Sequence, residues 1–419
     1  MPRKITLGYA EPLDDGFDED LFPSKIGGKP RWLDPTRPLA VDKAMCEECS
    51  TPMAMLLQLY APEDEPAAAF HRMFYVFVCR NGRCHKAAAK RCMRVFRSQL
   101  PEQNTVYVEK RVESTVDDSM SGPEESDDED DIEWTVSEDV KPASLCVVCG
   151  FHGSKTCSKC HSRYYCSRSH QIFDWESSHR KQCSEDSSQK GEETLEQERK
   201  LRRTTFPEYL IVSEETDEEG EGGDATYNGN AEEFDEDDES EDEDGEGIRP
   251  EDNALVPMNN ESVEDSSVDV DRAFLLFQNR TAKNPDQVLR YARAPGSSQA
   301  GEPLYVSDAD KPAPDIDVPE CGSCGAKREF EFQIMPQVLN YLSINSTDPF
   351  SIDWGTLLVY TCPNNCSKKT QKQPGRSVAY LPEVICRQNF SSQGIGEKYV
   401  RAMHGDDSGF EKQFESLNI

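Results

Sequence analysis

The sequence lacks any long apolar run. No stretch of about 18 apolar residues occurs along its 419 positions, and the N-terminal region has no short apolar segment of the kind found in secretory signals. We therefore expect neither a membrane span nor secretion. The sequence does hold 16 cysteines. In a chain without a secretory signal they predict metal binding in a reducing compartment, because disulfides form mainly in secreted proteins.

Basic residues are almost missing from two long stretches. Residues 113–140 hold 13 acidic residues and no Lys or Arg, and residues 213–271 hold 26 acidic residues and only one Arg. These stretches account for the formal charge of −34, since the rest of the chain carries a net charge of +4. Segments this acidic bury too little apolar surface to fold, so we predict disorder. They would serve as solvating spacers or as electrostatic shields for a strongly basic partner.

Signatures of catalysis are also missing. Gly27, Gly28 and Lys29 lie in one loop, but the spaced first Gly and the Ser or Thr of a phosphate-binding loop are absent. There is neither a cofactor-binding Gly cluster nor an Asn-His-Ser-Cys element of the kind expected in a methyltransferase. Because the Cys and His residues are assigned to zinc below, we predict that the protein is not an enzyme.

Eight Cys and His residues are concentrated within 38 positions. Their spacing is C-x2-C-x7-C-x2-C-x5-C-x3-H-x8-H-x3-C, formed by Cys146, Cys149, Cys157, Cys160, Cys166, His170, His179 and Cys183. Thiolate and imidazole ligands in this number suit two tetrahedral zinc ions. A segment this short buries too little apolar surface to fold alone, so metal binding would supply its folding free energy.

Two further cysteine clusters flank this segment. Cys46, Cys49, Cys79 and Cys84 form one set, and Cys321, Cys324, Cys362 and Cys366 form the other. Each set fits one closed structural zinc site without an open position for a substrate. The alternative is that they are small buried thiols. Cys92 and Cys386 have no partner by spacing and are predicted to be core thiols, while His85 and His161 are not expected to be ligands.

These patterns predict an α+β protein with two duplicated, β-rich zinc-binding halves. The N-terminal domain spans 1–112, an acidic disordered linker 113–140, the inserted finger 141–185, a second charged and mostly acidic linker 186–271, and the C-terminal domain 272–419. Eight residues separate Cys49 from Gln58, and eight separate Cys324 from Gln333. In each half the second cysteine pair follows an apolar run, Phe74–Val78 or Leu357–Thr361, which is typical of a buried strand.

Three other segments have clear local signals. Residues 4–9 alternate apolar and polar side chains, which predicts a half-buried strand. Asn284-Pro285-Asp286-Gln287 resembles a helix cap and predicts a helix to about Arg293. Residues 337–342 predict a second, short helix.

The cysteine-rich segment resembles the MYND zinc finger, on its spacing together with Tyr165, Gln171 and Trp175. This resemblance implies interleaved ligand sets: Cys146, Cys149, Cys166 and His170 hold one ion, and Cys157, Cys160, His179 and Cys183 hold the other. His170 stands where the finger usually has Cys, and zinc accepts imidazole equally well. The resemblance also implies that Gln171 and Trp175 line a shallow groove for proline-containing peptides, although Trp175 could simply pack against the zinc loops.

The flanking blocks resemble the programmed cell death protein 2 family, also called the zinc finger protein RP-8 family. The segments that carry this resemblance are 7–12, 22–33, 70–72, 94–101 and 352–362. It implies a dedicated chaperone in ribosome biogenesis that holds new ribosomal protein S2 for the 40S subunit, in the cytoplasm and also in the nucleus. The alternative is a MYND-dependent adapter for transcriptional corepressors. Neither direct nucleic-acid binding nor a membrane partner is expected.

Overall fold

The computed structural model describes residues 3–13, 21–86, 89–111, 132–183, 204–218, 271–293, 301–366 except 346 and 349, and 380–390. The chain divides into two compact units. One of them, Lys4–Asp217 with Asp271–Gln393, holds the elements described below, apart from the end residues of two strands.

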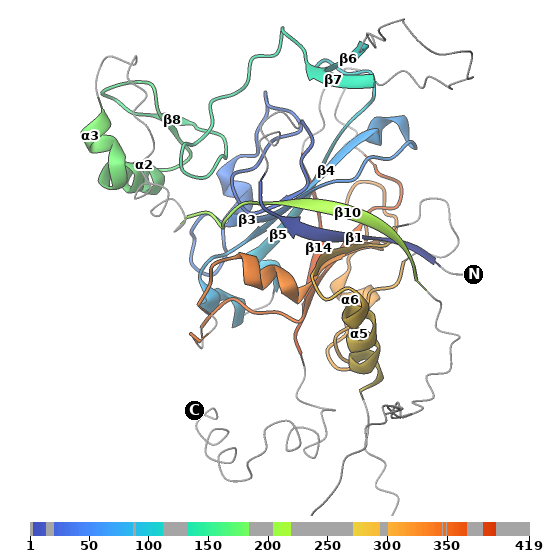
Figure 1. Ribbon diagram of the computed structural model, residues 1–419. Coiled ribbons are helices and arrows are strands. Elements are labelled where there is room, and N and C mark those ends of the chain that lie inside the picture. The colour runs from blue at the N-terminus through green and yellow to red at the C-terminus, as the bar shows by residue number, and fades with distance from the viewer. Residues whose placement is uncertain are drawn as a thin grey trace, which may run out of the picture. The chain divides into compact units, whose positions relative to one another are not determined.

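Ten strands form a closed barrel (Figure 1). Around the barrel they follow the order β1 (Arg3–Glu11), β10 (Tyr209–Glu218), β2 (Lys25–Ile26), β3 (Ala54–Tyr60), β4 (His71–Val78), β5 (Met93–Leu100), β14 (Leu381–Gln388), β13 (Thr356–Thr361), β12 (Glu329–Ile334) and β11 (Gln287–Tyr291). β11 pairs with β1 and closes the circle. The two halves of the chain therefore contribute to one sheet. They meet where β5 pairs with β14 and where β1 pairs with β11.

Helices are few and short in the described residues. The barrel carries α1 (Ala89–Cys92), α5 (Arg272–Lys283), α6 (Pro314–Asp317) and 3-10 turns at Val41–Ala44, Ala67–Ala69, Gly82–Lys86 and Pro336–Tyr341. The finger holds β8 (Lys155–Thr156), β9 (Tyr164–Tyr165), α2 (Arg168–Asp174), a π-helical turn (Trp175–His179) and α3 (Arg180–Gln182). None of the helices in the described ranges combines the length and apolar character that a membrane crossing requires. The protein is thus mostly β.

The strands predicted from apolar runs are confirmed. Residues 74–78 lie in β4 and residues 357–361 in β13, and both strands are buried along their whole length. Residues 4–9 lie in β1, where Ile5 and Leu7 are buried. A continuous apolar run marks β4 and β13 because side chains on both of their faces are covered, whereas β1 was predicted from its alternation. The short helix predicted at 337–342 is present as the 3-10 turn at Pro336–Tyr341.

The helix predicted from Asn284 to Arg293 is wrong. Asn284 instead ends a helix, α5, which begins after the N-cap Asp271. Pro285 disfavours helical backbone at the residue before it, so the same residues that resemble an N-cap also suit a helix end. The segment that follows forms β11 between β1 and β12, and tertiary pairing decides its conformation.

Two parts of the predicted acidic linkers are ordered strands, contrary to the prediction. Ile132–Val136 forms β7 and pairs with β6 (Tyr107–Arg111) in a two-stranded ladder, with Arg111 opposite Ile132. Tyr209–Glu218 forms β10 in the barrel. β7 contains Trp134, whose ring lies 4.8 Å from that of buried His71. The prediction of disorder rested on acidic composition and overlooked apolar residues such as Trp134, which pack on the barrel. The remaining parts of the two predicted linkers, residues 112–131, 184–203 and 219–270, lie outside the described residues.

The barrel interior holds both apolar and charged side chains. Phe74 of β4 packs on Phe332 of β12, with ring centroids 5.4 Å apart, although four strand pairings separate these strands around the barrel. Arg72 lies two residues earlier on the same face of β4 and is fully buried. Its guanidinium contacts Glu63 at 2.8 Å and Glu331 at 2.5 Å. Such a buried cation is tolerated because charged partners surround it.

The finger packs on the outer face of β4. Phe151 is 1% exposed, and its ring lies 5.0 Å from Phe77 and 5.8 Å from Trp32. The Trp32 indole N–H donates to the Gly150 carbonyl at 2.7 Å. Gly150 has a φ of +78°, and a Cβ there would meet Lys29 and Pro30 at 3.0 Å. The finger therefore shares one hydrophobic core with the barrel.

We predict that Phe151→Ala destabilises the zinc-loaded protein by about 3–5 kcal/mol, because it removes a buried ring between two aromatic residues. The measurement is the midpoint of urea unfolding. Phe390→Ala is the matched control, since Phe390 is 48% exposed, and it should shift the midpoint far less. Equal shifts for the two variants would show that the finger is not docked on the barrel.

Candidate metal centres

Four clusters of Cys and His side chains are present among the described residues. They are Cys46, Cys49, Cys79 and Cys84; Cys146, Cys149, Cys166 and His170; Cys157, Cys160, His179 and Cys183; and Cys321, Cys324, Cys362 and Cys366. Within each cluster the four potential ligand atoms lie within 4.8 Å of one another. These are the four sets predicted from the sequence, including the interleaved pairing of the finger.

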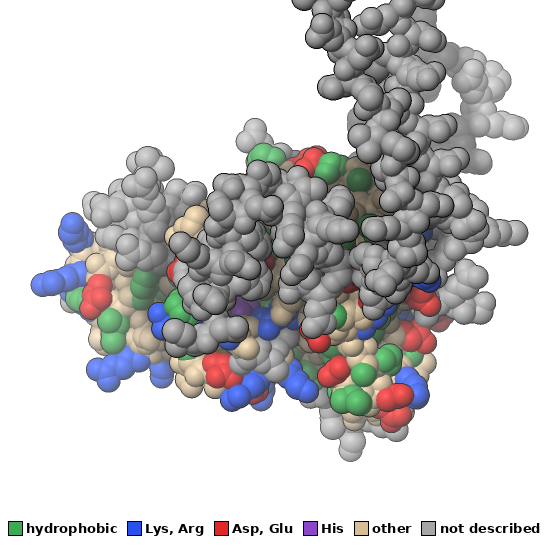
Figure 2. Space-filling model, turned by 90° about the horizontal axis from the view of Figure 1, so that it is seen from below, with side chains coloured by type: hydrophobic (Ala, Val, Ile, Leu, Met, Phe, Trp, Pro, Cys, Tyr) green, Lys and Arg blue, Asp and Glu red, His purple; other side chains and the backbone are tan. Residues whose placement is uncertain are grey.

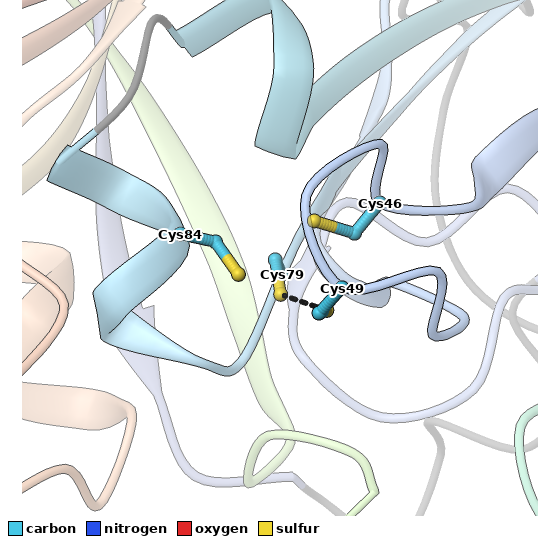
Figure 3. A group of neighbouring side chains, drawn as sticks. All are labelled: Cys46, Cys49, Cys79 and Cys84. Atoms are coloured by element: carbon cyan, nitrogen blue, oxygen red, sulfur yellow. Dashed lines mark hydrogen bonds between the residues drawn. The ribbon is translucent and has the colours of Figure 1, made fainter.

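The N-terminal cluster joins a loop before β3 to the segment after β4. Figure 3 shows the four side chains close together, brought there by two separate segments of the chain. The Cys49 and Cys79 sulfurs are 3.6 Å apart. A tetrahedral zinc ion with Zn–S bonds of about 2.3 Å sets its sulfurs about 3.8 Å apart, so the donor set fits zinc. Burial opposes ionisation of Cys49, but hydrogen bonds from Thr51 lower its pKa to about 7.

The C-terminal cluster repeats this arrangement around β12 and β13. Its sulfur distances are 3.3 Å for Cys321–Cys366 and 3.5 Å for both Cys324–Cys362 and Cys362–Cys366. Cys324 is exposed, and a hydrogen bond from the Ala326 backbone lowers its pKa to about 6. At neutral pH this lowered pKa favours the thiolate form of Cys324, which is the form that binds zinc.

His170 lies in the first finger cluster. Ser167 caps α2 by accepting a hydrogen bond from the His170 backbone, and this helix start directs the imidazole toward the sulfurs. Its Nδ1 lies 3.2 Å from the Cys166 sulfur and 3.6 Å from the Cys146 sulfur. His170 therefore occupies the geometric position of the usual cysteine and fits a zinc ion through Nδ1.

A π-helical turn shapes the second finger cluster. It spans Trp175–His179 and directs His179 Nε2 toward Cys157 and Cys160, at 3.3 Å and 3.5 Å from the sulfurs. Tyr165 holds the start of this turn in place, because its hydroxyl donates a hydrogen bond at 2.7 Å to Asp174, the residue just before the turn. The wider turn was not predicted, since Cys-His spacing carries no information on helix type.

A small groove lies beside this second cluster. Its volume is about 260 Å³, and its lining includes Gln171, Ile172 and Trp175 from the helix and Lys159 opposite. Ile172 is 46% exposed and Trp175 37% exposed. The predicted groove residues Gln171 and Trp175 therefore face the same hollow, and Ile172 joins them. Trp175 also meets the His179 ring at 5.7 Å, so it both packs on a candidate ligand and reaches solvent.

The unclustered Cys and His residues stay outside these centres. Cys92 is fully buried and Cys386 half-buried, and burial raises the pKa of each thiol to about 11. His85 places Nε2 2.6 Å from the Cys79 carbonyl oxygen, so it supports the N-terminal loop through the backbone. His161 is exposed and has a φ of +53°.

Sequence reasoning missed the residues that hold the C-terminal cysteine loop in place. Asn365 is 1% exposed, and its side-chain oxygen accepts hydrogen bonds from Arg72 at 2.9 Å and Arg293 at 3.3 Å. Its φ of +43° lies in the left-handed region, which Asn tolerates better than most residues. An Asn between two cysteines was the only signal, and it does not reveal partners that lie 72 and 293 positions away.

Comparison with known proteins agrees with this architecture. Residues 4–114 match the programmed cell death protein 2 N-terminal domain, residues 271–389 its C-terminal putative domain, and residues 146–183 the MYND finger. Programmed cell death protein 2 of Bos taurus is 35% identical over 386 residues, covering 92% of this chain and 96% of its own. That of Rattus norvegicus is 34% identical and covers 93% and 97%.

A third relative is more distant. The probable 20S rRNA accumulation protein 4 of Schizosaccharomyces pombe is 31% identical over 134 residues, which is 30% of each chain. No solved structure matches the chain. The chain is thus one of the zinc-finger proteins in which a MYND finger is inserted into a β-rich fold with further cysteine clusters. This chain belongs to the programmed cell death protein 2 family.

We predict four zinc ions per chain, because the described residues form four complete ligand sets. Cys46→Ser should lower the content to three and unfold the local loop, since the remaining thiolates lose their ion. Elemental analysis of the purified protein measures this. Cys386→Ser is the matched control and should retain four ions. Two ions or fewer in the unaltered protein would remove one or both outer centres.

Proposed function

We propose that this protein is a non-enzymatic chaperone that holds a newly made basic protein of the 40S subunit, ribosomal protein S2, during ribosome biogenesis. The observation that carries the proposal is the family relationship, which includes a relative named for 20S rRNA accumulation. The proposal places the protein in the cytoplasm, with passage into the nucleus. Its four zinc ions are structural, since each candidate site has four protein ligands and no open position.

The charge distribution supports a basic client. The two stretches 113–140 and 213–271 carry net charges of −13 and −25, against a formal charge of −34 for the whole chain. On the face that Figure 2 shows, Lys and Arg side chains of the described residues lie among Asp and Glu side chains. A free ribosomal protein binds polyanions nonspecifically through its basic segments, and an acidic chain competes for these segments. The same charge repels nucleic acid, so direct nucleic-acid binding is not part of the proposal.

We further propose that the two halves of the barrel arose by duplication. Gln58 and Gln333 make the same pair of contacts with neighbouring loops. Gln58 accepts from the Arg31 backbone and donates to the Pro23 carbonyl, both at 2.9 Å. Gln333 accepts from the Leu304 backbone at 2.8 Å and donates to the Leu304 carbonyl at 3.1 Å. Equivalent glutamines on β3 and β12, each after a C-x2-C pair, support a common ancestor for the halves.

The alternative function is a MYND-dependent adapter for transcriptional corepressors, which binds proline-containing peptides. The groove of about 260 Å³ with exposed Trp175 and Ile172 favours it. An aromatic ring beside an apolar side chain suits a proline ring. The groove could also serve the chaperone as a second contact, so the two functions are separated by partner identity.

We predict that co-expression of this protein raises the soluble fraction of ribosomal protein S2 and that the two proteins copurify in a 1:1 ratio after nuclease treatment. Trp175→Ala should leave this holding intact, because the finger groove is not the client surface in this proposal. Phe390→Ala serves as the control for loss of an exposed aromatic ring. Copurification of corepressor subunits, lost in Trp175→Ala, would favour the adapter instead.

We predict that the acidic stretches strengthen binding of the basic client by electrostatic attraction. Replacing the acids of 232–244 with Ser and Gln at constant length should weaken binding of the basic client and flatten its salt dependence, because salt screens exposed charges beyond about 10 Å at 0.1 M. Affinity is measured between about 50 and about 300 mM salt, over which the Debye length falls from roughly 14 Å to roughly 6 Å. The matched control exchanges Glu for Asp within 232–244 and should leave affinity unchanged. An unaltered salt slope in the neutral variant would reduce the stretch to a spacer.

A further inference from the structure

Each half of the barrel contains a cysteine loop that contacts the opposite half. We call residues 79–86 the N-terminal metal loop and residues 362–366 the C-terminal metal loop. Each loop supplies the second pair of cysteines of its own cluster. Both loops make contacts that cross from one half of the sequence to the other, and these contacts join the halves where the barrel closes.

The C-terminal metal loop is held by β4 and β5 of the N-terminal half. Its Asn365 side chain accepts from buried Arg72, and its Asn365 carbonyl accepts from Gln99 at 2.9 Å. The Cys366 carbonyl accepts from Arg97 at 3.1 Å. Arg72, Arg97 and Gln99 are all fully buried. Without this loop, two arginines and a glutamine in the barrel would lose hydrogen-bond acceptors, which is costly for buried polar groups.

The N-terminal metal loop is held by the C-terminal half in a corresponding way. Gly82 lies so close to residue 350 that a Cβ on it would stand 1.7 Å from the Phe350 carbonyl oxygen. Arg83 and Lys86 place their charges 4.2 Å and 4.4 Å from the centre of the Phe350 ring. Arg387 of β14 donates to the His85 carbonyl. The loop therefore fits the opposite half by close backbone approach and by charge.

The strand pairing between the halves is short where these loops act. Only three residue pairs join β5 to β14, from Leu381 opposite Arg97 to Glu383 opposite Val95. The two ladders that flank this one are longer, with eight residue pairs between β4 and β5 and five between β13 and β14. So short a ladder contributes little by itself, and the loop contacts join β5 to β14 together with the buried ion pair of Arg97 and Glu383 at 2.9 Å.

We propose that zinc loading closes the barrel: each metal loop takes the shape that fits the opposite half only when its own four cysteines hold an ion. Loss of the ion from either outer site then loosens the β5–β14 seam, including strands that contain no ligand. The C-terminal site is the more accessible of the two, because Cys324 is exposed and Cys366 half-buried, so it loses its ion first when a chelator is added.

The test is hydrogen exchange of the purified full chain, read by mass spectrometry on peptides covering 93–100, together with zinc analysis. Cys324→Ser should raise exchange in 93–100 roughly tenfold or more, while one ion is lost. Gly82→Ala should raise exchange in the same peptides without removing a ligand, because the added methyl group clashes with the Phe350 carbonyl. Gly322→Ala is the matched control, since a Cβ at that cysteine-loop glycine meets nothing within 4 Å.

Substitutions at Asn365 distinguish the effect of the loop contact from the effect of the metal. Asn365→Gly keeps the left-handed backbone and the carbonyl that Gln99 uses but removes the acceptor for Arg72, so exchange in 93–100 should rise with zinc content unchanged. Asn365→Asp restores a side-chain acceptor and should restore protection. If Cys324→Ser deprotects only its own loop, or if Gly82→Ala and Asn365→Gly leave 93–100 as protected as in Gly322→Ala, zinc does not close the barrel.

Discussion

The buried guanidinium of Arg72 joins the two halves of the molecule. It lies inside the barrel, where it contacts Glu63 of its own half and Glu331 and Asn365 of the other. Arg293 approaches the same carboxylates at 3.1 Å from Glu63 and 3.0 Å from Glu331. Charges removed from water are stabilised only when each finds its partner, so this cluster requires that both halves be folded and correctly registered. A misregistered barrel would leave several of these groups unpaired.

The finger belongs to the same folded body as the barrel, because the two share one hydrophobic core. It is inserted between β7 and β10 in the sequence, yet Phe151 and Gly150 fix it to the loop that carries Trp32. The groove beside Trp175 therefore has a defined position relative to the barrel, since the finger does not move as a tethered module. A partner held in the groove and a partner held on the barrel would lie at a fixed distance from each other.

Much of the site was predictable from the sequence, because zinc imposes strict rules on ligand type and spacing. All four clusters could be written down from Cys and His positions, and the family resemblance supplied the interleaving of the finger. The strands at Phe74–Val78 and Leu357–Thr361 were predictable because double-sided burial leaves an unbroken apolar run. By contrast, β11 was predicted as a helix, since its conformation depends on neighbours in the barrel. The Arg72 cluster was hidden because its members come from distant parts of the chain.

The ladder between β6 and β7 has a consequence for variation in length. The chain leaves β6 at Arg111 and returns at Ile132 directly opposite, so the segment between them begins and ends at one point of the fold. Doubling the length of such a connection costs only about 0.6 kcal/mol in closure entropy. Residues can thus be added to or removed from this acidic segment without altering the barrel.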